Sequence, residues 1–187
     1  MDTIRLVTWI NAPVERCFKL SASVDLHVAS AAATQEEVVG GVGSGLIGEG
    51  QTVTFRGRHF GLKLRHTSRI EAWRPYSFFR DVMVDGHFQR FEHDHHFAPM
   101  DDGTRIRDEI RFSLPWGALG RLVAKRLVRR HLTGFLAGRN EMIKRVAESE
   151  EWHRYLDGGQ ETKSDAAGES QRMRTWSKRS SVGGAKV

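Results

Sequence analysis

The feature that most constrains the fold of this chain is a change of hydrophobic period near Pro115. Before Pro115, apolar and polar side chains alternate as in half-buried β-strands, and after it the apolar side chains recur at the spacing of an amphipathic helix. The strand-like segments are about 4–10, 34–39, 51–58, 60–71, 77–85, 87–98 and 104–113, and the helical segment is roughly 116–150. Two short helices are expected between the first two strands, over 13–20 and 21–31.

This order of segments predicts an α+β fold. The last six strands are separated by turns that contain glycine, proline or aspartate, which favours antiparallel pairing of sequence neighbours. One of these turns is expected at Arg56-Gly57-Arg58, between the third and fourth of the seven strands. A sheet with one apolar face must cover that face with another layer. Because one long helix covers a curved sheet incompletely, we predict a seven-stranded curved antiparallel sheet, two short helices and a long C-terminal helix that together enclose a cavity.

Length and composition indicate one domain followed by a tail. We assign residues 1–152 to the domain and 153–187 to the tail, because from Gly158 onward the sequence is polar, glycine-rich and without hydrophobic period. No apolar run is long enough to span a membrane. A single cysteine, Cys17, fits a reducing compartment and core packing, so we expect a soluble cytoplasmic protein.

The segment VVGGVGSGLIGEG contains the spacing G-x-G-x-x-G at Gly43, Gly45 and Gly48. In dinucleotide-binding proteins this pattern precedes a helix whose N-terminus binds phosphate. Here the alternating residues of a strand follow instead, beginning at Gln51, and no Lys-Ser or Lys-Thr pair closes a P-loop. The glycines therefore indicate a flexible connection between two strands rather than a nucleotide site.

Several short motifs resemble, in order and spacing, those of the helix-grip superfamily of START domains, the birch-pollen allergen and polyketide cyclase/dehydrase-like proteins (SRPBCC), especially its bacterial branch of small ligand-binding members. The residues that carry the resemblance are Ile10, Ala12, Pro13, Glu15, Phe18, Gly45, Leu46, Gly48, Gly50, Val53, Thr54, His59, Phe60, Gly61, Thr67, Ser68, Arg69, Ile70, Phe79, Asp81, Gly86, Phe88, Phe91, His93, His95, Phe97, Thr104, Asp108, Pro115, Gly117, Leu119 and Gly120. The resemblance covers about 3–150 and implies a helix-grip fold with a hydrophobic cavity. It also implies that the loop of Gly43, Gly45, Gly48 and Gly50 is a mobile rim at the cavity entrance.

Strand alternation selects the side chains that face the predicted cavity, because alternate residues of a strand share a face. We predict an apolar lining of Phe55, Phe60, Leu64, Phe79, Phe91, Phe97 and Phe112 from the sheet and Leu132 from the long helix. Among these apolar residues the same pattern places ionisable ones, namely His66, Asp81, His93, His95 and Asp108. Since buried ionisable groups need partners, and the strands 87–98 and 104–113 are hairpin neighbours, we expect Asp108 to pair with His93 or His95.

These polar residues allow three interpretations. They form a structural network, or they orient the polar group of a mostly apolar ligand, or His93, His95 and Asp108 act as a general acid and base. A metal site formed by His93, His95 and either Asp81 or Asp108 is a weaker variant, because spacing fixes no third ligand. We therefore predict no metal and no cofactor.

The predicted function is binding of a small hydrophobic or amphipathic ligand, lipid-like or polyketide-like, in the cavity. A cyclase- or dehydratase-like enzyme that uses a His–Asp pair is the alternative, although no nucleophile motif is present. A third possibility is an interaction protein that works through its long basic helix. The fold alone does not decide among these, since it hosts carriers, cyclases and regulators.

The predicted long helix carries an excess of basic residues. Its first half contributes Arg121, Lys125, Arg126, Arg129 and Arg130. Such residues form a solvated face whose long stems cover apolar surface, or they attract anionic lipid or an acidic partner. No DNA- or RNA-binding motif accompanies them, so we expect no nucleic-acid partner and at most a weak contact with anionic membrane surfaces.

Overall fold

The computed structural model describes residues 1–115 and 118–157, except the side chains of 118–124. The described chain forms one compact unit through Leu156. Its elements are β1 (Asp2–Ile10), α1 (Val14–Ser21), α2 (Val24–Ser30), the single turn η1 (Ala32–Thr34), β2 (Glu37–Gly41), β3 (Thr52–His59), β4 (Leu62–Arg74), β5 (Phe78–Asp85), β6 (Arg90–Met100), β7 (Gly103–Ser113), α3 (Ala118–Ala147) and α4 (Trp152–Leu156). The predicted α+β element order is confirmed.

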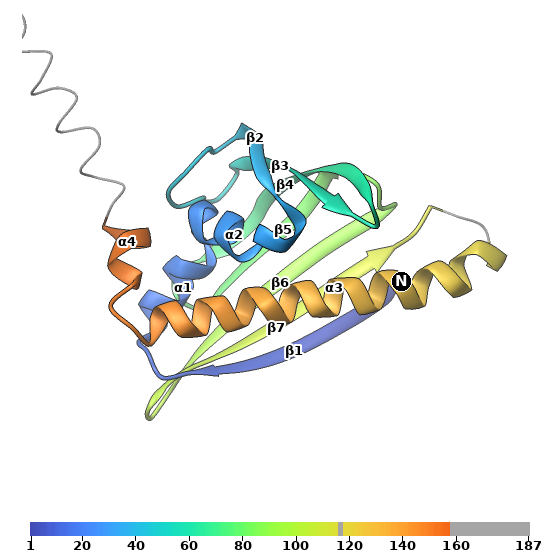
Figure 1. The fold of residues 1–187 in the computed structure, drawn as a ribbon. Coiled ribbons are helices and arrows are strands. Elements are labelled where there is room, and N and C mark those ends of the chain that lie inside the picture. The colour runs from blue at the N-terminus through green and yellow to red at the C-terminus, as the bar shows by residue number, and fades with distance from the viewer. Residues whose placement is uncertain (116–117, 158–187) are drawn as a thin grey trace, which may run out of the picture. The chain divides into compact units, whose positions relative to one another are not determined.

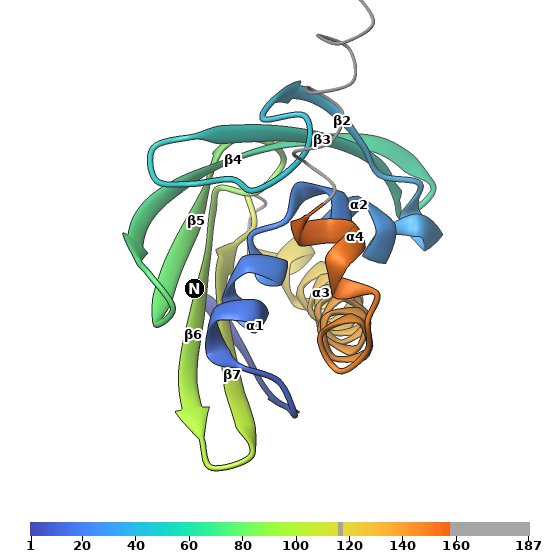
Figure 2. The same ribbon diagram turned by 90° about the vertical axis from the view of Figure 1, so that its left-hand side faces the viewer.

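All seven strands form one antiparallel sheet in the order β1-β7-β6-β5-β4-β3-β2. The first strand thus pairs with the last, Ile4 opposite Ile110, and every other pair is a sequence neighbour. The sheet bends around α3, and α1 and α2 lie on the same side of the sheet as α3 (Figures 1 and 2). This arrangement is the curved sheet and long helix that the change of period predicted.

Three predicted boundaries are wrong. Thr34 ends a 3-10 turn rather than beginning a strand, because Gln35 has a left-handed backbone (φ 52°) that separates η1 from β2. The turn between β3 and β4 falls on Phe60 and Gly61, both with positive φ, as in the hairpin turns that match strand twist. The expected turn at Gly57 is strand instead, so β3 continues through it.

The buried apolar side chains form two clusters. The larger one includes Phe18 of α1, which lies edge-on to Trp73, Phe79 and Phe97 of the sheet. The smaller one joins Ile4, Ile110, Phe112 and Leu114 to Val128 and Leu136 of α3. Members of both clusters also line the space that remains between the sheet and α3.

Cys17 and α4 complete the larger cluster. Burial raises the pKa of the Cys17 thiol to about 11, so this residue is a packed side chain and not an activated nucleophile. Trp152 of α4 packs against the cluster under the guanidinium of Arg16, whose carbon lies 4.4 Å from the ring centroid. Ordered structure therefore extends past the boundary predicted at residue 152, and the remainder of the predicted tail, 158–187, lies outside the described residues. None of the described helices is long and apolar enough to cross a membrane.

Candidate functional site

A cavity of about 210 Å³ lies between the sheet and α3. Most of the predicted lining residues line it, namely Phe55, Phe60, Leu64, His66, Phe79, Asp81, Phe91, His93, His95 and Leu132. Helix α2 and the residues around it add Ser21, Ser23, Val24 and His27, which the sequence did not single out. Whether the predicted lining residues bind a ligand stays a prediction. Strand alternation placed the side chains of those on strands correctly, whereas Phe60 lies in the turn between β3 and β4 and Leu132 lies on α3.

Three predicted lining residues do not line the cavity. Phe97 is covered by Phe18 of α1, and Phe112 is completely buried in the smaller cluster with Ile4. Asp108 is also completely buried, behind the histidines of β6. Each of these side chains lies on the predicted face of the sheet. Strand alternation does not tell which part of that face is covered by other side chains or a helix and which part lines the cavity.

The glycine loop is held against α2. Backbone bonds join Val24 N to Gly45 O and Ile47 N to Ala22 O, and Asp25 accepts a bond from Gly45 N at 2.7 Å. None of the four predicted rim glycines lines the cavity, although Ile47 between them does. The exposed lining residues Phe60, Arg65 and His87 lie elsewhere, on β4 and the connections beside it. The loop's role as a mobile entrance stays a prediction.

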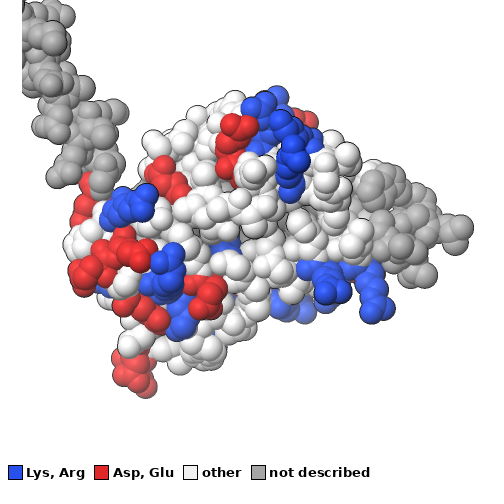
Figure 3. Space-filling view, in the orientation of Figure 1, with Lys and Arg blue, Asp and Glu red and all other residues white. Residues whose placement is uncertain are grey.

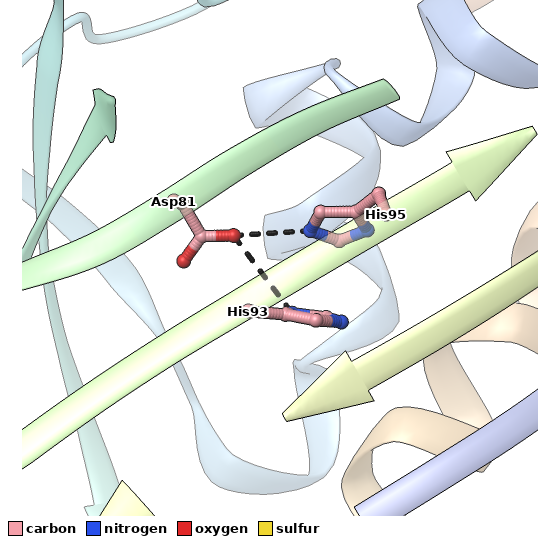
Figure 4. Close-up of side chains that lie close together, drawn as sticks. All are labelled: Asp81, His93 and His95. Carbon is pink, nitrogen blue, oxygen red and sulfur yellow. Dashed lines mark hydrogen bonds and ion pairs between the residues drawn. The ribbon is translucent and has the colours of Figure 1, made fainter. Parts of the chain in front are cut away.

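Four ionisable residues on three neighbouring strands form the sheet cluster: Asp81 of β5, His93 and His95 of β6, and Asp108 of β7. Register brings them together, because His93 lies opposite Asp81 and His95 lies opposite Asp108. His93 Nε2 is 3.0 Å from Asp108 Oδ1, which confirms the predicted pairing, and His95 Nε2 is 3.0 Å from Asp81 Oδ2. Figure 4 shows both imidazoles beside the Asp81 carboxylate.

Further side chains hold the two carboxylates of the sheet cluster. Asn140 of α3 donates to Asp108 Oδ2 at 2.6 Å, and Ser68 donates to Asp81 Oδ1 at 3.3 Å. His66 Nε2 in turn lies 2.8 Å from the Ser68 hydroxyl. Both oxygens of each carboxylate therefore have a neighbour, which fixes the carboxylates in place.

The charges of the sheet cluster follow from these contacts. Burial alone would raise the pKa of Asp81 and of Asp108, but the neighbouring imidazoles lower both pKa values below the ordinary range. Burial lowers the pKa of His93, and the adjacent His95 lowers it further. We infer two ionised carboxylates, Asp81 and Asp108, beside His93, whose imidazole resists protonation.

A second group of ionisable residues, the edge cluster, lines another part of the cavity. It joins His27 of α2, Glu36, His59 of β3 and His131 of α3. Glu36 accepts bonds from both sides, with His27 Nε2 and His59 Nε2 each 3.0 Å away, and His59 Nδ1 lies 2.8 Å from His131 Nε2. Burial opposes ionisation, yet the bonds from the two histidines lower the pKa of Glu36 to about 2.

Sequence reasoning missed the edge cluster, although one signal pointed to it. Gly57 lies inside β3, where a glycine indicates close approach of another chain segment. A Cβ on Gly57 would lie 2.5 Å from Glu36 Cγ, so the missing side chain makes room for the carboxylate. From sequence alone, Arg56-Gly57-Arg58 indicates a turn, and this interpretation hides the signal.

Arg139 of α3 is the one other charged residue deep in the cavity among those described. It is 8% exposed and lines the cavity beside Leu136. Its Nη2 donates to the Ser21 carbonyl at 2.6 Å, whereas its Nη1 has no hydrogen-bond partner among the described residues. Burial lowers the pKa of Arg139, and the nearby carboxylates of Asp108 and Asp81 oppose that effect.

A curved antiparallel sheet and a long helix across it, with a cavity between them, define the helix-grip fold. No known protein-family profile matches the chain, and no curated protein sequence is significantly similar to it. Solved structures do share the fold. TTHA0849 from Thermus thermophilus is 22% identical, with a TM-score of 0.60 over 76% of this chain and 97% of its own.

Two further structures connect the fold to named groups. The ginseng major latex-like protein 151 from Panax ginseng is 13% identical, with a TM-score of 0.58 over 78% of this chain and 97% of its own. A START superfamily protein from Mycobacterium smegmatis is 10% identical, with a TM-score of 0.57 over 78% and 97%. The helix-grip fold that the resemblance predicted is therefore confirmed.

The surface of α3 differs between its two halves (Figure 3). Lys and Arg gather over the first half without Asp or Glu on this face, whereas both signs mix near the C-terminal end of α3. Arg126 and Arg130 are exposed around Leu127, which is 57% exposed, but Lys125 pairs with Asp2 and Arg129 bonds the Thr3 carbonyl. The side chain of Arg121 lies outside the described residues.

Proposed function

We propose that this protein binds a small hydrophobic or amphipathic ligand, lipid-like or polyketide-like, in the cavity between the sheet and α3. Aromatic and aliphatic side chains make up most of the lining, with a few polar groups at defined places, as in other ligand sites. The volume of about 210 Å³ lies below the roughly 300–1,000 Å³ of typical ligand pockets. That size favours a single short chain or a single ring system over a two-chain lipid.

Arg139 carries this proposal. A buried guanidinium with a free N–H group is costly, because its lost hydration is not replaced. An oxygen acceptor on a ligand in the cavity, such as a carboxylate, would supply the missing bond to Nη1. The lining would then bind the apolar part of the same molecule, so the proposed ligand is an amphipathic acid.

Matched probes test the role of Arg139. Titration calorimetry would compare octanoate with 1-octanol, which has the same chain length and no charge. Because a charge-assisted hydrogen bond contributes about 1.5–3 kcal/mol, we expect Arg139→Met to weaken octanoate binding about 10- to 100-fold and to leave octanol binding nearly unchanged.

Arg126→Met, an exposed change on the same helix, is the control and should bind both probes like the wild type. Native mass spectrometry of the purified protein, followed by extraction, would identify any ligand that it retains. A protein that carries no ligand and binds neither probe, nor any member of a broad hydrophobic library, would contradict the proposal.

Acid–base catalysis in the same cavity is the second candidate function. It is supported by His93 and His95, which line the cavity while each lies 3.0 Å from a carboxylate that can orient it. The corresponding reaction is cyclisation or dehydration of a polyketide-like substrate. The test is incubation of the protein with a poly-β-keto or β-hydroxy thioester. Conversion that is abolished by His93→Gln would favour the enzyme, and equal product with and without protein would contradict this second candidate function.

Weak contact with anionic membrane surfaces through Arg121, Lys125, Arg126, Arg129 and Arg130 remains a proposal. Two of these residues already have partners within the chain, which limits the contact. Sedimentation with vesicles of phosphatidylserine and phosphatidylcholine should show binding that disappears as salt is raised. Equal recovery on purely zwitterionic vesicles would contradict it.

A further inference from the structure

The sheet cluster presents three ligand atoms to one point. Asp81 Oδ2 lies 3.0 Å from His95 Nε2 and 3.8 Å from His93 Nδ1, and all three atoms lie within 4.8 Å of one another (Figure 4). Among the described residues, no other group of three His, Cys, Asp or Glu side chains meets that limit. We propose that these three atoms bind a divalent transition-metal ion.

The distances suit such an ion. Two ligands that are each 2.0–2.1 Å from a metal, at angles between about 90° and 110°, lie roughly 2.9–3.4 Å apart. The separation between Asp81 and His95 is already in this range, and that between Asp81 and His93 exceeds it by a few tenths of an ångström. Complete metal geometry requires a rotation of His93 that brings Nδ1 closer to Asp81 Oδ2 and to His95 Nε2, both of which lie within 4.8 Å of it.

The opposite edges of both imidazoles face a second carboxylate. His93 Nε2 is 3.0 Å and His95 Nδ1 is 2.9 Å from the same atom, Asp108 Oδ1. Metal-bound histidines commonly donate their other N–H to a carboxylate, which fixes the ring orientation and strengthens the metal bond. Asp108 is fully buried and held by Asn140, so it is already in place to accept from His93, whereas a bond from His95 Nδ1 requires a change of angle.

One buried nitrogen is explained by the metal. His95 Nδ1 is close to Asp108 but at a poor angle, so it makes no hydrogen bond among the described residues. A neutral imidazole carries only one N–H. Without an ion, that proton is needed on His95 Nε2 to bond Asp81, so Nδ1 faces the Asp108 carboxylate without a proton. A metal on Nε2 removes that conflict, because the proton then belongs on Nδ1, facing Asp108.

Charge favours a cation at the same point. When the imidazoles are neutral, Asp81 and Asp108 carry two negative charges, and Arg139 supplies one positive charge nearby. A divalent ion turns this deficit into a net charge of +1 on the site, which an anionic ligand would then neutralise. Two imidazoles and one carboxylate are the ligand set of non-haem iron and of some zinc sites, which keep further positions open.

The open positions face the cavity, since Asp81, His93 and His95 all line it. A bound ion can therefore meet the polar end of a ligand or hold a water molecule there. Ser68 contributes from the side of Asp81, where its hydroxyl donates to Oδ1 and leaves Oδ2 for the ion. The inference stands apart from the organic ligand, because it requires only these side chains.

Cobalt(II) is the probe for this site. Protein treated with EDTA and dialysed would be titrated with CoCl₂ while the visible absorption is recorded. We expect d–d bands that saturate at one equivalent, and a higher melting temperature with Co²⁺ than without it. Asp81→Asn and His95→Gln should weaken Co²⁺ binding at least 10-fold.

His96→Gln is the matched control, because His96 lies on the same strand but packs against Phe78 on the opposite face. Asp108→Asn, which touches no ion, should weaken binding about 10- to 100-fold if it orients the histidines. Circular dichroism would show whether each variant is folded. If one of Asp81→Asn, His95→Gln and Asp108→Asn is unfolded, Co²⁺ binding by the folded ones tests the proposal. Absence of saturable Co²⁺ binding to the wild type overturns the proposal, as does binding that Asp81→Asn and Asp108→Asn leave unchanged.

Discussion

The sheet cluster and the edge cluster are built from the same residue types in one cavity, but they are assembled differently. In the sheet cluster, Asp81, His93 and Asp108 lie on three adjacent strands, and strand register alone sets their distances. In the edge cluster, Glu36 meets His27 from α2 and His59 from β3. The first cluster is a consequence of pairing, and the second exists only when helix, strand and connection are all in place.

This difference has an energetic side. Asp108 is fully buried, whereas His131, at the end of the edge cluster, is partly exposed. An uncompensated polar group costs most where water cannot reach it. Disruption of the sheet cluster should therefore destabilise the protein more than equivalent disruption of the edge cluster.

Asp108→Ala should have the largest effect. It removes the acceptor of His93 Nε2 and one of the two acceptors of Asn140 Nδ2, which keeps only Thr8 Oγ1. We expect a loss of about 3–5 kcal/mol in the free energy of unfolding, measured by urea denaturation. Asp85→Ala, an exposed change, should stay within about 0.5 kcal/mol of the wild type. A variant at position 108 as stable as the parent would show that the buried pair is not formed.

Glu36→Gln should have a smaller effect, and one that depends on pH. His27, His59 and, through His59, His131 face this carboxylate, and the pKa of Glu36 is lowered to about 2. A carboxyl group whose pKa is lowered by folding stabilises the protein above its unfolded pKa, and that contribution disappears as pH falls through the folded pKa. We expect wild type to exceed Glu36→Gln by about 1–3 kcal/mol at pH 6.

The same difference should shrink between pH 4.5 and pH 2, as the wild-type carboxylate becomes protonated. Urea denaturation of both proteins across this range measures it, and contributions from other carboxyl groups cancel in the subtraction. A difference that stays constant with pH would mean that Glu36 does not bind the two histidines.

Gly57→Ala tests how the edge cluster obtains its space. The new methyl group would lie 2.5 Å from Glu36 Cγ, so the carboxylate must move or β3 must shift. We expect a loss of about 1–3 kcal/mol in urea denaturation. Gly43→Ala is the matched control, because a Cβ there meets nothing within 4 Å. Equal stability of the two variants would show that Glu36 does not approach β3 closely.

His131→Ala should have the smallest effect of the four. The histidine bonds His59 Nδ1 at 2.8 Å but remains partly exposed, so water can replace the lost contact. A loss below about 1 kcal/mol is expected in the same urea experiment. A loss as large as that of Asp108→Ala would erase the proposed distinction between the two clusters.

Strand alternation predicted much of the cavity because it depends only on neighbours in the chain. His93 and His95 face the same side as Phe91 because they follow it by two and four residues along the strand. The hairpin between β6 and β7 then brings Asp108 to them. Phe97 shows the limit of this reasoning. It has the expected face, but α1 covers it, and the packing position of a helix is not encoded in strand alternation.

The helical contributions to the site could not be predicted in this way. Arg139 and Asn140 lie within a helix whose amphipathic pattern shows them as polar interruptions, and nothing local distinguishes a buried arginine from a solvated one. Glu36 lies in a connection, where periodicity gives no orientation. Gly57 did carry information, since a glycine inside a strand indicates close approach, but the partner could not be known from it.

By itself, the sequence determined the order of strands and helices, the antiparallel sheet and the face of each strand that turns inward. These properties follow from periodicity and turn residues, which act over a few neighbouring positions. The tertiary structure alone decided where α1, α2 and α3 cover that face, and so where a cavity remains. It also decided that Arg139 and Glu36 meet their partners there, because contacts between distant segments depend on how whole elements pack and not on local pattern.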